Sequence, residues 1–166
     1  MPARRSAARR AGTYIAFEND VALFARQLKQ LGLAIPWVGS ASVASTTARN
    51  LAGPALDGVY SVTDYNAAVG PRAKKYFDDF SKAYGKAPDT SSSWAYDSVL
   101  LTAEAISKAG GTEPGKIQAA LRSLRNFEGT EGTYNFDDNG DGLRGYSVVR
   151  NDNGEEVFVK HIEFEK

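Results

Sequence analysis

The chain has 166 residues, of which 42% are hydrophobic and 24% are charged, with 20 basic and 20 acidic side chains. This length allows one domain with a hydrophobic core, and the balanced charge gives no electrostatic reason to expect a nucleic-acid partner. Cysteine is absent, which excludes disulfides, thiolate nucleophiles and sulfur-ligated zinc. No stretch approaches the roughly 18 apolar residues that span a bilayer.

Residues 1–12 differ in composition from the rest of the chain. They contain four arginines: Arg4, Arg5, Arg9 and Arg10. A charged region of this kind can open an export signal, but the apolar segment of about 7 to 15 residues that a signal requires does not come after it. We therefore expect a basic disordered arm, or a start that does not belong ahead of the first strand, and no signal peptide is visible. The folded domain is expected over 13–166.

The segment 13–64 alternates strand and helix signals. Apolar residues at a 3.6-residue period predict a helix that is capped by Asn19 or Asp20 and ends at Gly32. The other expected elements are strands over 13–17, 35–38 and 57–62 and a small helix over 43–51. Strands that alternate with helices imply a parallel sheet, so the sequence predicts an α/β fold.

Helices are predicted in the segment 65–126, and strands in 127–166. The first helix opens at Pro71, the second runs from about 92 to 109, and the third is capped by Thr112. The expected apolar stripe of the second helix is Tyr96, Val99, Leu100, Ala103 and Ile106. Asn153-Gly154 lies between two alternating runs, which predicts a β-hairpin.

Several short sequence segments along the chain resemble those of a known family. They are Leu23-Phe24-Ala25-Arg26-Gln27 through Leu31-Gly32-Leu33, Trp37-Val38-Gly39-Ser40, Leu51-Ala52-Gly53, Leu56-Asp57-Gly58-Val59-Tyr60 and Trp94-Ala95-Tyr96-Asp97. In this order they resemble the substrate-binding proteins of bacterial branched-chain amino acid (Leu/Ile/Val) ABC transporters, in their C-terminal half only. The resemblance implies a partial type I periplasmic-binding-protein fold, with a Rossmann-like lobe, a parallel sheet, added helices and a C-terminal β-hairpin.

The resemblance also implies how the segments divide between lobes. In the family, two α/β lobes joined by three chain crossings close on a ligand. By analogy, 13–64 supplies strands and helices of the C-terminal lobe, the helices of 65–126 pack on the N-terminal lobe, and 127–166 forms the C-terminal strands and hairpin. The chain is then a fragment that lacks most of the N-terminal lobe. We expect a homodimer that covers the face of the missing lobe, or an aggregation-prone monomer.

Candidate ligand-binding residues come directly after the strands of the expected sheet, because ligands of open α/β sheets bind beyond the carboxyl ends of the strands. These residues are Phe17, Glu18, Ser40, Ala41, Ser42 and Asp64. The resemblance implies that an aromatic at Phe17 and an acidic residue at position 41 hold a ligand's ammonium group. Since Ala41 is uncharged, Glu18 or Asp64 would have to replace it. Phe17 also suits a core position, and the two serines suit loops and caps.

Neither a metal site nor a catalytic site is predicted. The segment 137–142 matches the first half of an EF-hand calcium loop, but Val148 occupies the position that requires a bidentate glutamate. An Asx- and Gly-rich turn explains the same residues. The only histidine, His161, has no nucleophile near it in sequence, and no catalytic or cofactor motif is present. The sequence therefore predicts a protein that is not an enzyme and has no cofactor.

Three functions remain open at the level of sequence. The leading one is the substrate-binding component of an ABC importer for branched-chain amino acids or related small amino acid or carboxylate ligands, with a membrane permease as partner. The resemblance then implies a periplasmic or extracellular location. The second is a ligand-sensing regulatory module of the same fold. The third is a folded remnant without a function of its own.

Overall fold

A computed structural model describes residues 11–142 and 145–164. Residues 1–10 of the expected basic arm lie outside this description, and the first strand begins at Gly12. The chain divides into two compact units: residues up to Val62 together with 149–157, and residues from Thr63 to Val148 together with those from Phe158 onward.

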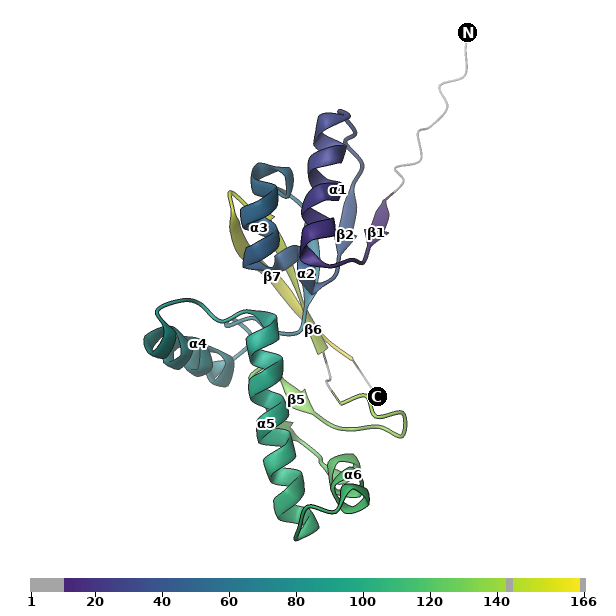
Figure 1. The fold of residues 1–166 in the computed structure, drawn as a ribbon, viewed down its shortest axis with the longest axis vertical. Helices are drawn as coiled ribbons and strands as arrows, with labels where there is room; N and C mark the ends of the chain where they lie inside the picture. Colours follow the sequence, from purple (N-terminus) through teal and green to yellow (C-terminus); the bar gives the residue numbers. More distant parts are fainter. Residues whose placement is uncertain (1–10, 143–144, 165–166) are drawn as a thin grey trace. The chain divides into compact units, whose positions relative to one another are not determined.

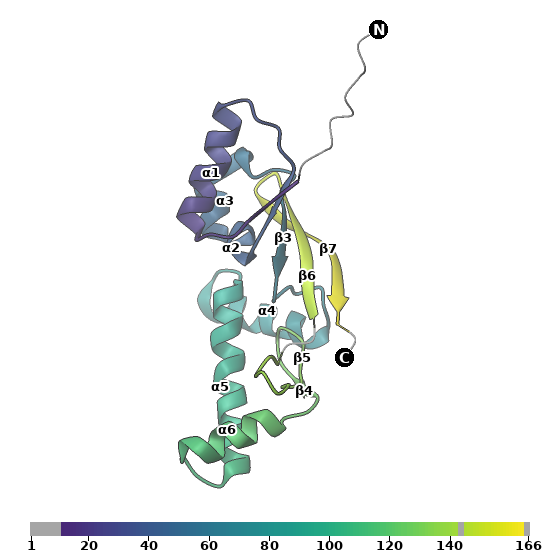
Figure 2. The same ribbon diagram turned by 90° about the vertical axis from the view of Figure 1, so that its right-hand side faces the viewer.

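The first unit has parallel strands with helices between them. Its successive elements are β1 (Gly12–Tyr14), α1 (Glu18–Gln30), β2 (Trp37–Gly39), α2 (Ala41–Ala44), α3 (Thr46–Ala52), a 3-10 helix (Gly53–Ala55) and β3 (Tyr60–Thr63). Strand β2 pairs in parallel with both β1 and β3, and Figure 2 shows the three helices on one side of these strands. The predicted α/β arrangement with a parallel sheet is therefore confirmed.

Small and aromatic side chains hold α1 to the strands. The buried cluster consists of Val21, Ala22, Ala25, Val43, Ala48, Ala52, Leu56 and Val59. Four alanines in this cluster let the helices approach closely. The ring of Phe24 stacks on Tyr14 with centroids 4.1 Å apart and meets Trp37 edge-on at 5.3 Å. The predicted cap of α1 is wrong, because Phe17 occupies the N-cap without a side-chain hydrogen bond.

The second unit contains three helices and a short antiparallel pair of strands. Its elements are α4 (Pro71–Tyr84), α5 (Thr90–Ala109), α6 (Pro114–Ser123), β4 (Phe127–Glu128) and β5 (Thr133–Tyr134). The three predicted helices are confirmed (Figure 1). Helix α5 begins two residues earlier than expected, after a capping box formed by Asp89 and Ser92. The N-cap of α6 is Glu113, so the predicted Thr112 cap is wrong.

Helix α5 buries a different face from the one that its apolar residues indicate. Its buried residues are Ser93, Asp97, Leu101 and Ala105. Val99, a member of the expected apolar stripe, is 67% exposed. The reason is that Ser93 and Asp97 bond to the segment around residues 130–134. Hydropathy therefore indicates the wrong face, because hydrogen-bonded polar side chains occupy the buried one.

The C-terminal strands β6 (Gly145–Asp152) and β7 (Glu155–Glu163) complete a five-stranded sheet of order β1-β2-β3-β6-β7. Asn153 and Gly154 join them with φ values of 51° and 82°, as a two-residue hairpin turn requires, so the predicted hairpin is confirmed. Asp137 Oδ1 accepts the backbone N–H of Asn139 and of Asp141, both at 2.9 Å, which confirms the predicted Asx turn.

Membrane spans and metal-ligand clusters are both absent from the described part of the chain. No helix of residues 11–142 and 145–164 is both long enough and apolar enough to cross a membrane. Over the same ranges, no three histidine, cysteine, aspartate or glutamate side chains gather as the ligands of a metal ion would.

Candidate functional site

The segments after β1 and β2 lie at one edge of the parallel sheet. Tyr14 at the end of β1 pairs with Gly39 at the end of β2, so the residues beyond them emerge in the same direction. Phe17 is the N-cap of α1 and is 79% exposed. Glu18 is the first, half-buried residue of that helix. An aromatic ring and a carboxyl group are therefore available to a ligand at this edge.

Ser40, Ala41 and Ser42 form the equivalent segment after β2. The hydroxyl of Ser61 in β3 donates to the Ser40 carbonyl at 2.7 Å, which fixes the start of α2 against the next strand. The Ser40 side chain makes no capping hydrogen bond. Gly39 has to be glycine here, since a Cβ at this position would overlap the side chain of Val43. The chain is thus held tightly where it turns from β2 into α2.

Asp64, the sixth predicted site residue, belongs to the second unit. The indole Nε1–H of Trp94 donates to Asp64 Oδ2 at 2.7 Å. Burial raises the pKa of Asp64, while the hydrogen bond from Trp94 acts in the opposite direction. Five of the six predicted residues therefore come after neighbouring strands in the first unit, and Asp64 is held by Trp94 in the other.

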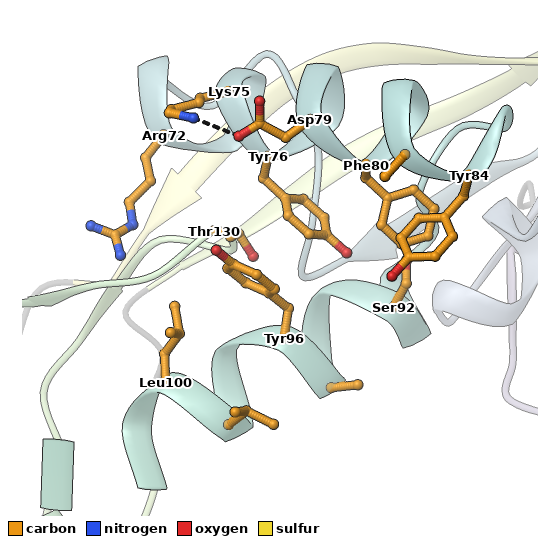
Figure 3. A pocket seen from close by; sticks show the side chains of 13 residues that line it. Arg72, Lys75, Tyr76, Asp79, Phe80, Tyr84, Ser92, Tyr96, Leu100 and Thr130 are labelled. Carbon is orange, nitrogen blue, oxygen red and sulfur yellow. Dashed lines mark hydrogen bonds and ion pairs between the residues drawn. The ribbon is translucent and has the colours of Figure 1, made fainter. Parts of the chain in front are cut away.

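A separate cavity lies within the second unit, between α4 and α5 (Figure 3). Its volume is about 820 Å³. Aromatic rings dominate its wall: the centroid of Tyr76 lies 4.9 Å from that of Tyr96 and 5.7 Å from that of Phe80. Arg72 and the exposed Lys75 also line it. None of the six predicted site residues contributes to this wall.

Sequence reasoning missed a buried polar cluster in the second unit. Asp97 of α5 accepts the backbone N–H groups of Thr130 and Glu131 at 2.8 and 3.1 Å. The Glu131 carboxyl group in turn lies within hydrogen-bond distance of the hydroxyls of Ser93 and Tyr134, at 2.6 and 2.7 Å. The one available signal was the four-residue spacing of Ser93 and Asp97, which puts both on one face of a helix.

The fold is that of part of a type I periplasmic binding protein. Over 92% of this chain and 44% of the other, it matches the crystal structure of a leucine-binding protein from Thermotoga maritima with a TM-score of 0.85 and 29% identity. An isoleucine complex of a branched-chain amino acid transporter substrate-binding protein from Streptococcus pneumoniae matches with a TM-score of 0.79 and 24% identity, over 90% of this chain and 44% of that one. At that identity the second match shows the fold alone.

The chain belongs to the periplasmic binding protein family, whose model matches residues 4–155. This is a family of solute-binding proteins, and the membership confirms the resemblance found in the short sequence segments. The expected partial fold is confirmed as well.

Curated relatives carry names that concern amino acids. The leucine-, isoleucine-, valine-, threonine- and alanine-binding protein of Pseudomonas aeruginosa is 31% identical over 128 residues, which are 75% of this chain and 33% of the relative. A Leu/Ile/Val-binding protein homologue of Brucella suis is 23% identical over 145 residues, 87% of this chain and 39% of the relative. The chain thus spans between a third and two fifths of the length of these relatives.

Proposed function

We propose that this chain acts as the substrate-binding component of an ABC importer, or as part of one, for branched-chain amino acids or related small amino acid or carboxylate ligands. The observation that carries the proposal is the 31% identity to the Pseudomonas aeruginosa protein over 75% of the chain. The leucine-binding protein from Thermotoga maritima supports it independently, because that structure combines 29% identity with a TM-score of 0.85.

The proposed ligand contacts are those at the edge of the first unit. Phe17 offers an exposed ring to a ligand's ammonium group, as the resemblance implies, and Ser40 and Ser42 offer hydroxyls and backbone groups after β2. Of the two acidic candidates for an ammonium group, we favour Glu18. It is adjacent to Phe17 in the same unit, whereas the Asp64 carboxylate already accepts the indole N–H of Trp94.

A ligand panel tests the proposal. Leucine, isoleucine, valine, threonine and alanine are compared with benzoate, which has no ammonium group, in thermal unfolding of the full chain. Because the chain spans 44% of the solved leucine-binding protein, we expect weak binding with Kd of about 1 mM, or about 4 kcal/mol. A ligand at ten times its Kd then stabilises the folded state by about 1.4 kcal/mol. No stabilisation by any of these compounds would contradict the proposal for this chain.

The role of Glu18 is tested by removing the ammonium group from the ligand. Leucine is compared with 4-methylpentanoate, which keeps the side chain and the carboxylate. We expect leucine to bind more tightly to the chain, and the Glu18→Gln variant to abolish the preference, since an uncharged amide gives up most of the attraction. Asp64→Asn is the matched variant and is expected to keep the preference. Equal binding of both ligands to the unaltered chain would exclude Glu18 from this role.

The proposed partner is a membrane permease, and the proposed location is the periplasm or the cell exterior. The pairing of two copies stays a prediction. It is motivated by exposed apolar side chains on the second unit, such as Val99 at 67% and Tyr84 at 68% exposure. Light scattering of the purified chain tests it: a discrete dimer would support the pairing, and a monodisperse monomer would exclude it.

A further inference from the structure

Four buried side chains form a hydrogen-bonded series inside the second unit. The hydroxyl of Ser93 contacts Glu131 Oε1 at 2.6 Å and the carbonyl oxygen of Thr90 at 2.8 Å. The hydroxyl of Tyr134 contacts Glu131 Oε2 at 2.7 Å and Asp97 Oδ2 at 3.1 Å. Ser93, Asp97 and Glu131 are each at most 3% exposed, and Tyr134 is 8% exposed. Water therefore has little access to replace any of these contacts.

The cluster has too few hydrogen atoms for its contacts when Glu131 is ionised. Ser93 and Tyr134 each have one hydroxyl hydrogen, and together they make four contacts to oxygens that only accept: a carbonyl and two carboxylates. In two of the four contacts, two acceptor oxygens would then face each other without a hydrogen atom between them. A proton on Glu131 Oε1 is donated to Ser93, whose own hydrogen is then free for the Thr90 carbonyl. One additional proton thus removes one of the two conflicts.

The charges around Glu131 also favour its neutral, protonated form. Asp97 of α5 and Asp64, the residue after β3, both repel a second negative charge. Tyr134 of β5 and Tyr146 of β6 are the other titratable groups that interact with it. Among residues 11–142 and 145–164, no lysine, arginine or histidine forms an ion pair with Glu131. An ionised Glu131 would therefore be buried without a compensating cation.

We propose that Glu131 is a proton-binding site, in which the folded second unit holds this side chain as a neutral carboxylic acid and releases its proton as the pH rises. Release puts a second negative charge beside Asp97 and weakens the attachment of residues 129–131 to α5. The site binds a proton, and its chemistry is separate from the proposed ligand-binding edge of the first unit.

The direction of the pH dependence comes from linkage. Burial raises the pKa of Glu131 from 4.5 to about 7, and the hydrogen bonds from Ser93 and Tyr134 oppose the rise without cancelling it. Between these two values the folded chain binds a proton that the unfolded chain has released, so stability falls with increasing pH. The contribution is complete below about 4.5 and is lost as the pH rises through about 7.

Two measurements test the proposal on the full chain. In the first, carbon NMR follows the Glu131 carboxyl carbon of the unaltered chain, identified by backbone assignment, through a pH titration. We expect a midpoint close to 7. A midpoint below about 5, in the range of ordinary glutamates, would overturn the proposal. This measurement requires no variant, so it stays decisive if a substitution prevents folding.

The second measurement compares urea unfolding midpoints at about pH 5 and about pH 8. The unaltered chain is expected to lose stability between the two, and Glu131→Gln, which keeps a donor and an acceptor, is expected to lose less. The control is Glu128→Gln, an exposed glutamate in the same segment, which should behave like the unaltered chain. Parallel pH dependence in the unaltered chain and Glu131→Gln would overturn the proposal.

Hydrogen exchange tests the structural consequence separately. The amides of Thr130 and Glu131 donate to Asp97, so their protection factors report how firmly this turn is held. We expect both factors to fall above neutral pH in the unaltered chain and to stay constant in Glu131→Gln. Protection that does not change with pH in the unaltered chain would contradict the proposed weakening.

Discussion

The backbone N–H of Thr130 donates to both carboxylate oxygens of Asp97 at 2.8 Å, although the two residues are separated by 33 positions in the sequence. Asp97 is 1% exposed and also accepts the N–H of Glu131 and the hydroxyl of Tyr134. A single side chain thus holds the turn before β5 to helix α5. Gly129 permits this approach, because a Cβ there would overlap both Asp97 and Tyr134.

Replacing Asp97 with asparagine should therefore destabilise the protein. The amide group of Asn has one acceptor oxygen instead of two, so buried donors lose their partner at a cost of about 1 to 3 kcal/mol in the free energy of unfolding. Urea denaturation measures this loss in the free energy of unfolding. Asp79→Asn is the matched control, since Asp79 forms an exposed pair with Lys75 and should change stability much less. Equal effects of the two substitutions would show that Asp97 does not hold the turn.

Gly39→Ala should destabilise the first unit. The added methyl group would overlap the side chain of Val43 and press on the carbonyl of Tyr14, and overpacking of this kind costs about 1 to 3 kcal/mol. Gly115→Ala is the control in α6, where nothing lies within 4 Å of the added Cβ. Since alanine also favours the helix, this control should raise stability by up to about 1 kcal/mol. Thermal unfolding of both variants shows whether Gly39→Ala lowers stability and Gly115→Ala raises it.

Asp89→Ala should weaken the start of α5. The Asp89 carboxylate accepts the N–H of Ser92 at 2.9 Å, and the Ser92 hydroxyl contacts the Asp89 backbone N–H in return. Loss of such a cap costs about 1 kcal/mol. Glu113→Ala is a suitable comparison, because Glu113 is the N-cap of α6 but makes no side-chain capping bond. Denaturation curves in which both substitutions cost the same would argue against the capping box.

Trp94→Phe should move the titration of Asp64 to higher pH. The indole N–H stabilises the charged form of this carboxylate, so its removal raises the pKa of Asp64 above the value that burial already gives it. Carbon NMR of the Asp64 carboxyl group measures the change. Trp37→Phe, in the first unit, is expected to leave this titration in place.

Local signals predict the elements of this fold better than its buried faces. Pro71 and the Asn153-Gly154 turn act through backbone conformation, which neighbouring residues determine, and both predictions are confirmed. The predicted caps of α1 and α6 are wrong, although capping is also a local signal. The predicted buried face of α5 is wrong because it depends on partners elsewhere in the chain. For α5 the decisive partners are Thr130 and Glu131, more than 30 residues away.

The same distinction applies to the candidate site. Parallel pairing of β1 with β2 places Phe17 and Ser40 after neighbouring strands, as the alternation of strands and helices predicted. The hydrogen bond between Asp64 and Trp94 could not be predicted, since it joins residues 30 positions apart with no periodic relation. The acidic cluster around Glu131 was missed for the same reason. Its residues become neighbours only through the packing of β5 on α5.

The central claim is that a small amino acid or carboxylate binds where β1 and β2 end, and NMR mapping tests it most directly. The isotope-labelled chain is titrated with leucine, and the amide shifts are followed residue by residue. We expect the largest changes at Phe17, Glu18 and Ser40 to Ser42. Changes confined to the aromatic cavity around Tyr76 and Tyr96, or no changes up to several times the expected Kd of about 1 mM, would contradict it.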